Sequence, residues 1–158
     1  MKKSISIFLP LAMLALLCGC GSIHRKDSVT FYYRNAQFQF GTQSGAIGSE
    51  KREISGQKNN LTYLNTLYML GPADEKLELP FPAGTKVKSA YLNEGNVTIE
   101  LVPGGNMSDS AFTLGCTCLA LNNFALTDAA TVTVTTERKS LTIARDSAIL
   151  TDSTAANG

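Results

Sequence analysis

The sequence predicts an α+β domain in which two helices pack on one face of a small mixed sheet. Apolar residues recur at helical spacing in two segments, and short β-branched runs lie on either side of them. Two of those runs are separated by a turn that suits a hairpin. We therefore expect the order strand, helix, two-stranded hairpin, helix and strand, built from residues 29–144 of the 158-residue chain.

The first strand is expected at residues 29–34, where Val-Thr-Phe-Tyr-Tyr-Arg combines β-branched and aromatic side chains. The alternating run at 38–40 is expected to extend or return this strand before several glycines loosen the chain. Residues 50–54 are interpreted as a further edge strand whose charged side chains face water.

The first helix is predicted from an apolar stripe that follows a cap residue and ends at a stop signal. Asn59 or Asn60 is the expected N-cap. Gly71-Pro72 is the stop, since glycine adopts the left-handed cap and proline cannot continue a helix. The stripe is formed by Leu61, Leu64, Leu67, Tyr68 and Leu70.

Residues 85–92 and 97–102 form the predicted hairpin, with Gly95 in the turn because it suits a positive φ. Alternation places Val87 and Tyr91 on one face of the first strand. The side chains that share one face of the second strand are Val97, Ile99 and Leu101.

The second helix is predicted to follow an N-cap at Ser108, Asp109 or Ser110 and to run to about Phe124. Its buried stripe comprises Phe112, Cys116, Leu119 and Ala120, with Leu121 and Phe124 close by. The segment is short and contains asparagines, so we expect a core helix rather than a membrane span.

The domain is expected to close with a strand at 130–136 that pairs with 141–143 across a turn. Residues 145–158 form the predicted disordered tail, whose last eight residues are small or polar and offer little to bury.

The N-terminal segment has the parts of a secretory signal. Lys2 and Lys3 form a basic start, and the apolar run at 5–17 is shorter than the about 20 residues that span a bilayer. The run closes with Leu-Cys-Gly-Cys at 17–20, which resembles a bacterial lipobox. Cleavage is expected between Gly19 and Cys20.

Cys20 is the predicted lipidation site, which would carry a diacylglyceryl thioether with palmitate-type acyl chains. Residues 1–19 would then be removed as a signal peptide, and residues 20–28 would form a lipidated tether. The protein would lie on the extracytoplasmic face of the cell membrane, held by a membrane lipid anchor. The alternative is an ordinary cleaved signal ahead of a secreted, unanchored domain.

The composition argues against several classes of function. The formal net charge is +1 including two lysines of the leader, which argues against nucleic-acid binding. His24, the one histidine, lies in the tether, so the domain has no residue for a Ser-His-Asp or Cys-His arrangement. Cys116 and Cys118 are expected to be small buried residues, and no metal or other cofactor is predicted.

Other candidate chemistry is weak. Gly104-Gly105 lies between a strand and a helix and is interpreted as a plain turn rather than a phosphate loop. A wall hydrolase would need two paired carboxylates, but we expect solvated positions for all five candidates. These are Asp74, Glu75, Glu78, Glu94 and Glu100. Tyr63 lies off the leucine stripe of the first helix and is the best candidate for an exposed aromatic that holds a sugar or peptide.

From residue 29 to about 143 the chain resembles the GerMN domain, the sporulation and spore germination module. The matching residues are Tyr32-Tyr33, Leu64-x-x-Leu67-x-x-Leu70-Gly71-Pro72, Pro82-x-Gly84-Thr85-Lys86-Val87, Gly95-Asn96-Val97-Thr98-Ile99 and Thr131-Val132-Thr133-Val134. The resemblance implies an extracytoplasmic interaction module rather than an enzyme. It also implies envelope proteins as partners, a homo-oligomer among the possibilities, and a role in sporulation or germination.

Two functions are therefore carried forward. The first is a lipid-anchored, non-catalytic module that docks on other envelope proteins. The second is a lipoprotein whose aromatic groove binds the cell wall or a solute.

Overall fold

The computed structural model describes residues 27–39, 45–57 and 59–148. The elements are β1 (Asp27–Asn35), β2 (Ile47–Ile54), α1 (Leu61–Tyr68), β3 (Leu77–Glu78), β4 (Lys86–Asn93), β5 (Asn96–Val102), α2 (Asp109–Leu126), β6 (Thr131–Thr135) and β7 (Ser140–Ala144). The α+β class and the predicted order of its main elements are confirmed. The first strand begins at Asp27 and so includes the last two residues of the predicted tether, because Asp27 pairs with Ile54 of β2.

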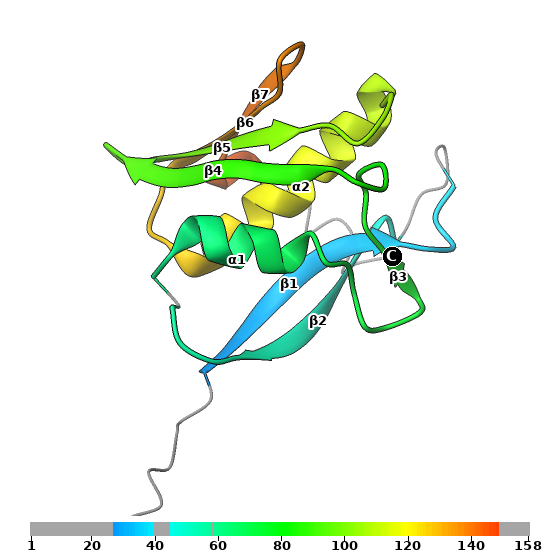
Figure 1. Ribbon diagram of the computed structural model, residues 1–158, viewed down its shortest axis with the longest axis horizontal. Coiled ribbons are helices and arrows are strands. Elements are labelled where there is room, and N and C mark those ends of the chain that lie inside the picture. Colours follow the sequence, from blue (N-terminus) through cyan, green and yellow to red (C-terminus); the bar gives the residue numbers. More distant parts are fainter. Residues whose placement is uncertain (1–26, 40–44, 58, 149–158) are drawn as a thin grey trace, which may run out of the picture.

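The strands form two sheets rather than the single sheet that was predicted. One has the order β2-β1-β3, and the other has the order β4-β5-β6-β7. The helices lie between the sheets (Figure 1), because α2 contacts β1 on one side and β6 and β7 on the other. Cys116 and Cys118 point about 200° apart on α2, yet both are fully buried. A helix buried on opposite sides needs cover on both, which one sheet cannot provide.

Two helix side chains bond to strand backbone groups that no neighbouring strand reaches. The Thr62 hydroxyl of α1 accepts a hydrogen bond from Ala90 N–H of β4 at 2.9 Å and donates to Ala90 C=O at 3.0 Å. Asn122 Oδ1 of α2 accepts from Tyr32 N–H of β1 at 2.6 Å. Each helix therefore supplies the partner that a further strand would otherwise provide.

The prediction that the charged side chains of β2 face water is wrong for two of them. Lys51 and Glu53 are exposed, but Glu50 and Arg52 turn inward and pair with each other. Arg52 donates to Gly71 C=O at 2.8 Å, and Glu50 accepts from Ala73 N–H at 2.9 Å. The pair is half-buried because it satisfies backbone groups of the loop that follows α1.

A β-bulge between Val87 and Ser89 changes the inward face of β4. Val87 is half-buried, but after the bulge Ala90 is the buried residue and Tyr91 is 49% exposed. The prediction that Val87 and Tyr91 share a face is therefore wrong, since the extra residue shifts the alternation by one.

Two local predictions need correction, and a third is confirmed. Phe38 and Gln39 lie outside any strand, because the chain turns immediately after β1; Phe40 is outside the described residues. Helix α1 ends at Tyr68, so Leu70 falls beyond its stripe and is 76% exposed. Gly71 does adopt the left-handed conformation expected of it, with φ of 87°.

The chain continues in ordered structure past the predicted end of the domain. Residues 145–148 form a helical turn, and Ala148 is 1% exposed. Arg145 donates to the carbonyls of Phe124, Thr127 and Ala129 at 2.7–3.1 Å. These contacts cap the end of α2 and explain why the start of the predicted disordered tail is folded.

Within the described part of the chain, no helix combines the length and hydrophobicity that crossing a membrane requires. The segment 111–126 lies in α2 and is a buried core helix, as predicted, although it packs between two sheets rather than on one. Cys116 and Cys118 are free thiols, and burial raises the pKa of each to about 12.

Candidate binding site at the start of the second helix

A cavity of about 560 Å³ lies where β5 ends and α2 begins. Strands β5 and β6 are parallel, and α2 is the crossover between them. The carboxyl ends of both strands therefore open at the same edge, the usual position of ligand sites in parallel sheets. The wall is formed by Val102, Pro103, Met107 and Phe112, and the turn at 136–139 completes it.

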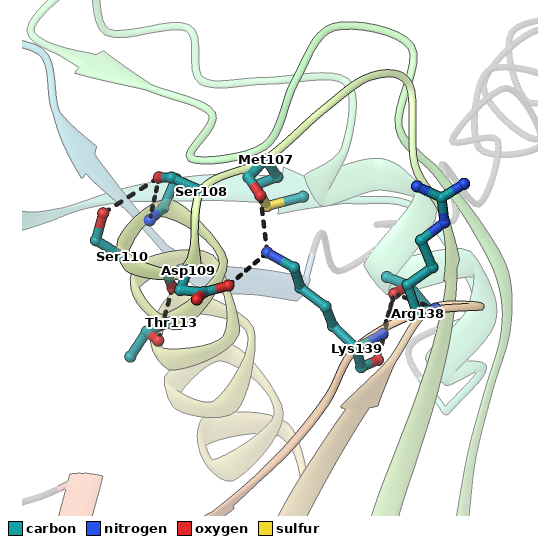
Figure 2. Close-up of polar contacts among 9 residues, drawn as sticks. Met107, Ser108, Asp109, Ser110, Thr113, Arg138 and Lys139 are labelled. Atoms are coloured by element: carbon teal, nitrogen blue, oxygen red, sulfur yellow. Dashed lines mark hydrogen bonds and ion pairs between the residues drawn. The ribbon is translucent and has the colours of Figure 1, made fainter.

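Lys139 joins the two sides of this cavity. Its Nζ donates to Asp109 Oδ1 at 2.7 Å and to Met107 C=O at 2.8 Å (Figure 2). The same ammonium lies 5.7 Å from the ring centroid of Phe112. The hydrogen bond and charge of Lys139 lower the pKa of Asp109 below its ordinary value. The turn after β6 is thereby fastened to the first turn of α2.

The start of α2 is held by its own hydroxyl groups. Ser108 Oγ accepts from Ala111 N–H at 3.2 Å, which is the N-cap contact expected from the sequence. The hydroxyls of Ser108 and Ser110 lie 3.2 Å apart, and Thr113 donates to Asp109 C=O at 2.9 Å. The helix therefore presents a fixed end to the cavity.

The turn at 136–139 is ordered by Thr136. Its Oγ1 accepts from Lys139 N–H at 3.0 Å and from Arg138 N–H at 3.3 Å. This arrangement orients Lys139 toward α2, whereas the Arg138 side chain extends away from these contacts and is exposed (Figure 2).

Gly104 has a structural rather than a phosphate-binding role. A Cβ on Gly104 would lie 2.1 Å from Ala83 C=O and 2.5 Å from Thr85 N. Its N–H is already used, donating to Thr85 Oγ1 at 3.1 Å. The interpretation of Gly104-Gly105 as a plain turn is thus supported by close backbone packing.

The arrangement suits binding through an apolar wall with basic groups at the rim. Val102 is 49% exposed, and Met107 adds a flexible apolar surface. Arg138 offers an exposed guanidinium at the same cavity. A segment that carries an apolar side chain next to a carboxylate would match these features. Among the described residues, no group of three His, Cys, Asp or Glu side chains could hold a metal ion.

Several residues singled out in the sequence lie elsewhere. Gly19 and Cys20, the predicted cleavage and lipidation residues, are outside the described residues. Tyr63 is not an exposed platform, since it is half-buried and packs against the core. Tyr91 is instead the exposed tyrosine, because the bulge in β4 turns its side chain to the surface. That bulge has no clear signal in the sequence.

The candidate carboxylates are dispersed, as expected of solvated positions. Glu78 pairs with Arg34 at 2.8 Å, and Glu100 pairs with Lys88 at 3.1 Å. Asp74 Oδ1 accepts from a backbone N–H within its own loop. Glu75 and Glu94 are exposed.

Sequence reasoning missed the contact between Lys139 and Asp109. The two residues are 30 positions apart, and each alone is an ordinary charged residue near an element end. Only the parallel pairing of β5 with β6 brings them together.

Comparison with solved structures identifies the fold. The tandem GerMN domains of the sporulation protein GerM from Bacillus subtilis align with a TM-score of 0.55 and 18% identity, covering 82% of this chain and 48% of that one. The chain thus spans about half the length of that protein. A candidate lipoprotein from Clostridium perfringens aligns with a TM-score of 0.47 and 14% identity, covering 77% and 89% of the two chains. No family model matches the sequence, and no curated protein sequence matches it. The chain therefore has a GerMN-like fold, in agreement with the resemblance seen in its sequence.

Proposed function

We propose that this protein is a lipoprotein held at the outer face of the cell membrane through Cys20, and that its GerMN-like domain binds other envelope proteins without catalysing a reaction. The observation that carries the proposal is the position of a lipobox-like Leu-Cys-Gly-Cys sequence directly ahead of a domain with the fold of the GerMN domains of a sporulation protein.

The anchor would keep the domain close to the bilayer. Cys20 precedes the first residue of β1, Asp27, by seven positions, which can span at most roughly 25 Å. Two acyl chains on Cys20 would hold it stably, because each buried CH₂ contributes about 0.8 kcal/mol. The partner must therefore reach, or reside in, the zone next to the membrane.

The anchor is tested by cell fractionation and intact-mass measurement. The wild-type chain should pellet with membranes and carry the mass of a diacylglyceryl group. Cys20→Ala should lose both, whereas Cys18→Ala should lose neither. Membrane retention of Cys20→Ala without added lipid mass would refute lipid anchoring.

The cavity beside α2 is the surface that we assign to the protein partner. Its apolar wall and the exposed Arg138 suit a segment with an apolar residue beside an acidic one. The supporting experiment is a crosslinked pull-down of tagged full-length protein from its host. Val102→Asp should reduce the recovery of specific partners, whereas Leu70→Asp, an exposed position that does not line the cavity, should not.

The identity of the recovered partners tests the biological process. Enrichment of sporulation or germination proteins would support a role there, as the fold of GerM suggests. Recovery of other envelope proteins would retain the interaction module but reject the sporulation role. A chain with no specific partner in crosslinked envelopes would reject the module itself.

A second function, binding of the cell wall, is favoured by one observation. Tyr91 is 49% exposed on β4, and its cross-strand neighbours on the outer face are Thr98, Thr133 and Thr142. An aromatic ring beside hydroxyl groups suits a sugar. Sedimentation with purified wall material should fall in Tyr91→Ala and persist in Tyr63→Phe if this function holds.

A further inference from the structure

Strand β7 has an open edge along the sheet β4-β5-β6-β7. Thr136 N–H donates to Lys139 C=O, and Arg145 N–H donates to Ala130 C=O. Because hydrogen-bonded pairs alternate in an antiparallel ladder, the odd-numbered residues of β7 bond to β6. The backbone groups of Ser140 and Thr142 and the N–H of Ala144 therefore point away from the sheet, and no strand among the described residues pairs with this side of β7. The C=O of Ala144 begins the helical turn at 145–148 and keeps one lone pair for a further donor.

Other exposed edges of this fold are protected, but β7 is not. The β4 edge is covered by Thr62 at Ala90, and β2 presents the charged side chains of Lys51 and Glu53. Strand β3 has only two residues. Strand β7 reads Ser-Leu-Thr-Ile-Ala, with neither the charge nor the proline that usually prevents edge pairing.

We propose that β7 pairs with β7 of a second copy of this chain, antiparallel and centred on Thr142. The three outward residues then match in register. Thr142 faces Thr142 of the second copy, and Ser140 faces Ala144. Each matched pair exchanges two backbone hydrogen bonds, so the two four-stranded sheets join into one continuous sheet.

Charge complementarity supports a second copy as the occupant. This register brings Arg138 of one copy toward Asp146 of the other, and the two-fold symmetry makes the contact twice. Both residues are exposed, and they lie at opposite ends of β7. Lys139 and Arg145 would also face each other, but their charged groups are bound to Asp109 and to the carbonyls at the end of α2. The like charges are thus already compensated within each copy.

A five-residue seam is small, so we expect weak association in free solution. Anchoring both copies in one membrane would raise their effective concentration and favour pairing. That enhancement rests on the proposed function, whereas the pairing geometry does not.

The experiment places a cysteine on the symmetry axis. In the proposed ladder the two Thr142 Cα atoms lie about 5.5 Å apart, within the roughly 4.4–6.8 Å that a disulfide bridges. Full-length Thr142→Cys should give a dimer on mild oxidation of isolated membranes, with peptide mapping that identifies a 142–142 bridge. In Ser140→Cys, the matched control, the two cysteines would be four residues out of register, roughly 13 Å apart. It should give no 140–140 bridge.

Two further variants separate pairing from folding. Thr142→Pro removes an outward N–H that β6 does not use, so it should abolish association while the domain stays folded by circular dichroism; Thr142→Val should retain it. Arg138→Asp should reduce dimer yield several-fold, and adding Asp146→Arg should restore it.

The same chain with Cys20→Ala, purified and concentrated, distinguishes the two proposals. A 142–142 bridge in this unanchored chain would support the pairing even if lipidation proved wrong. The pairing is overturned if no such bridge forms in membranes or in concentrated solution, or if 140–140 bridges form equally well. A second result would also overturn it. If the outward amides of β7 are protected from hydrogen exchange in the monomer, and truncation after Ala148 removes that protection, the chain's own end occupies the edge.

Discussion

Asn65 of α1 and Asn123 of α2 form a reciprocal amide pair in the centre of the molecule. Each Nδ2 donates to the Oδ1 of the other, at 3.1 and 2.9 Å, and the two side chains are 2% and 0% exposed. The amides also donate to Leu61 C=O and Leu119 C=O, so each is satisfied along its own helix. The pair fixes one helix against the other with directional bonds that apolar packing would not supply.

Removing both amides should cost less than the sum of the costs of removing each one alone. Asn65→Ala leaves the buried Asn123 amide without its partner and should destabilise the domain by about 2–3 kcal/mol. The double variant Asn65→Leu/Asn123→Leu should lose less than the sum of the two single leucine variants. Urea unfolding in a double-mutant cycle measures this coupling, and strict additivity would show that the pair contributes nothing as a unit.

Glu50 should make stability depend on pH in the acid range. Burial alone would raise its pKa, but hydrogen bonds from Asp74 N–H, Arg52 and Ala73 N–H lower it below the ordinary 4.5. A carboxyl with a lowered folded pKa contributes stability above its unfolded pKa and loses it as pH falls through the folded pKa. The stability gap between wild type and Glu50→Gln should therefore be present at pH 7 and shrink below about pH 4.5.

Chemical unfolding of both chains between pH 7 and pH 3 measures this gap. Glu137→Gln, at an exposed position in the turn after β6, is the matched control and should follow wild type throughout. A gap for Glu50→Gln that stays constant over the whole range would contradict the assignment.

Arg145 should behave as part of the folded domain. Its guanidinium donates to three carbonyls and lies 4.8 Å from the ring centroid of Phe124. Arg145→Met should cost about 2–3 kcal/mol, because those carbonyls lose a charged donor. Arg138→Met, at an exposed position, should change stability by less than about 0.5 kcal/mol. Truncation after Ala144 should destabilise the domain more than truncation after Ala148, and equal effects would place the boundary back at residue 144.

The two adjacent glycines of the loop before α2 should tolerate alanine differently. A Cβ at Gly104 meets backbone atoms at 2.1–2.5 Å, whereas at Gly105 the nearest atom is Pro82 Cβ at 3.7 Å. Gly104→Ala should therefore lower stability by about 1–3 kcal/mol and Gly105→Ala by much less. Thermal unfolding of the two variants is a direct comparison, and similar melting temperatures would refute the close packing.

Local sequence signals predicted much of this fold. Asn60 and Ser108 were each among the candidate N-caps, and both accept the hydrogen bond that an N-cap should accept, from Tyr63 N–H and Ala111 N–H. The hairpin of β4 and β5 and the pairing of β6 with β7 were likewise expected from alternation and turn residues. These features depend on residues close together in the chain, which is why sequence patterns contain them.

Other features depend on contacts between distant segments and could not be predicted. The bulge at Val87 that exposes Tyr91, and the division into two sheets around α2, follow from how whole elements pack. Lys139 meets Asp109 across 30 positions, and Glu50 meets the loop after α1 across 23. In each case a charged residue that would be expected in water finds backbone or ionic partners that only the folded chain assembles.

The sequence by itself determined the class of the fold, its helix caps and its central hairpin, because propensity and hydrophobic period act locally. It also carries the Leu-Cys-Gly-Cys sequence at 17–20, whose resemblance to a lipobox is the basis for proposing an anchor at Cys20. The tertiary structure alone decided that the helices lie between two sheets and that the cavity forms beside Lys139. It also decided that the β7 edge stays open among the described residues. These outcomes depend on which surfaces the packed elements cover, and that is a property of the whole domain rather than of any one segment.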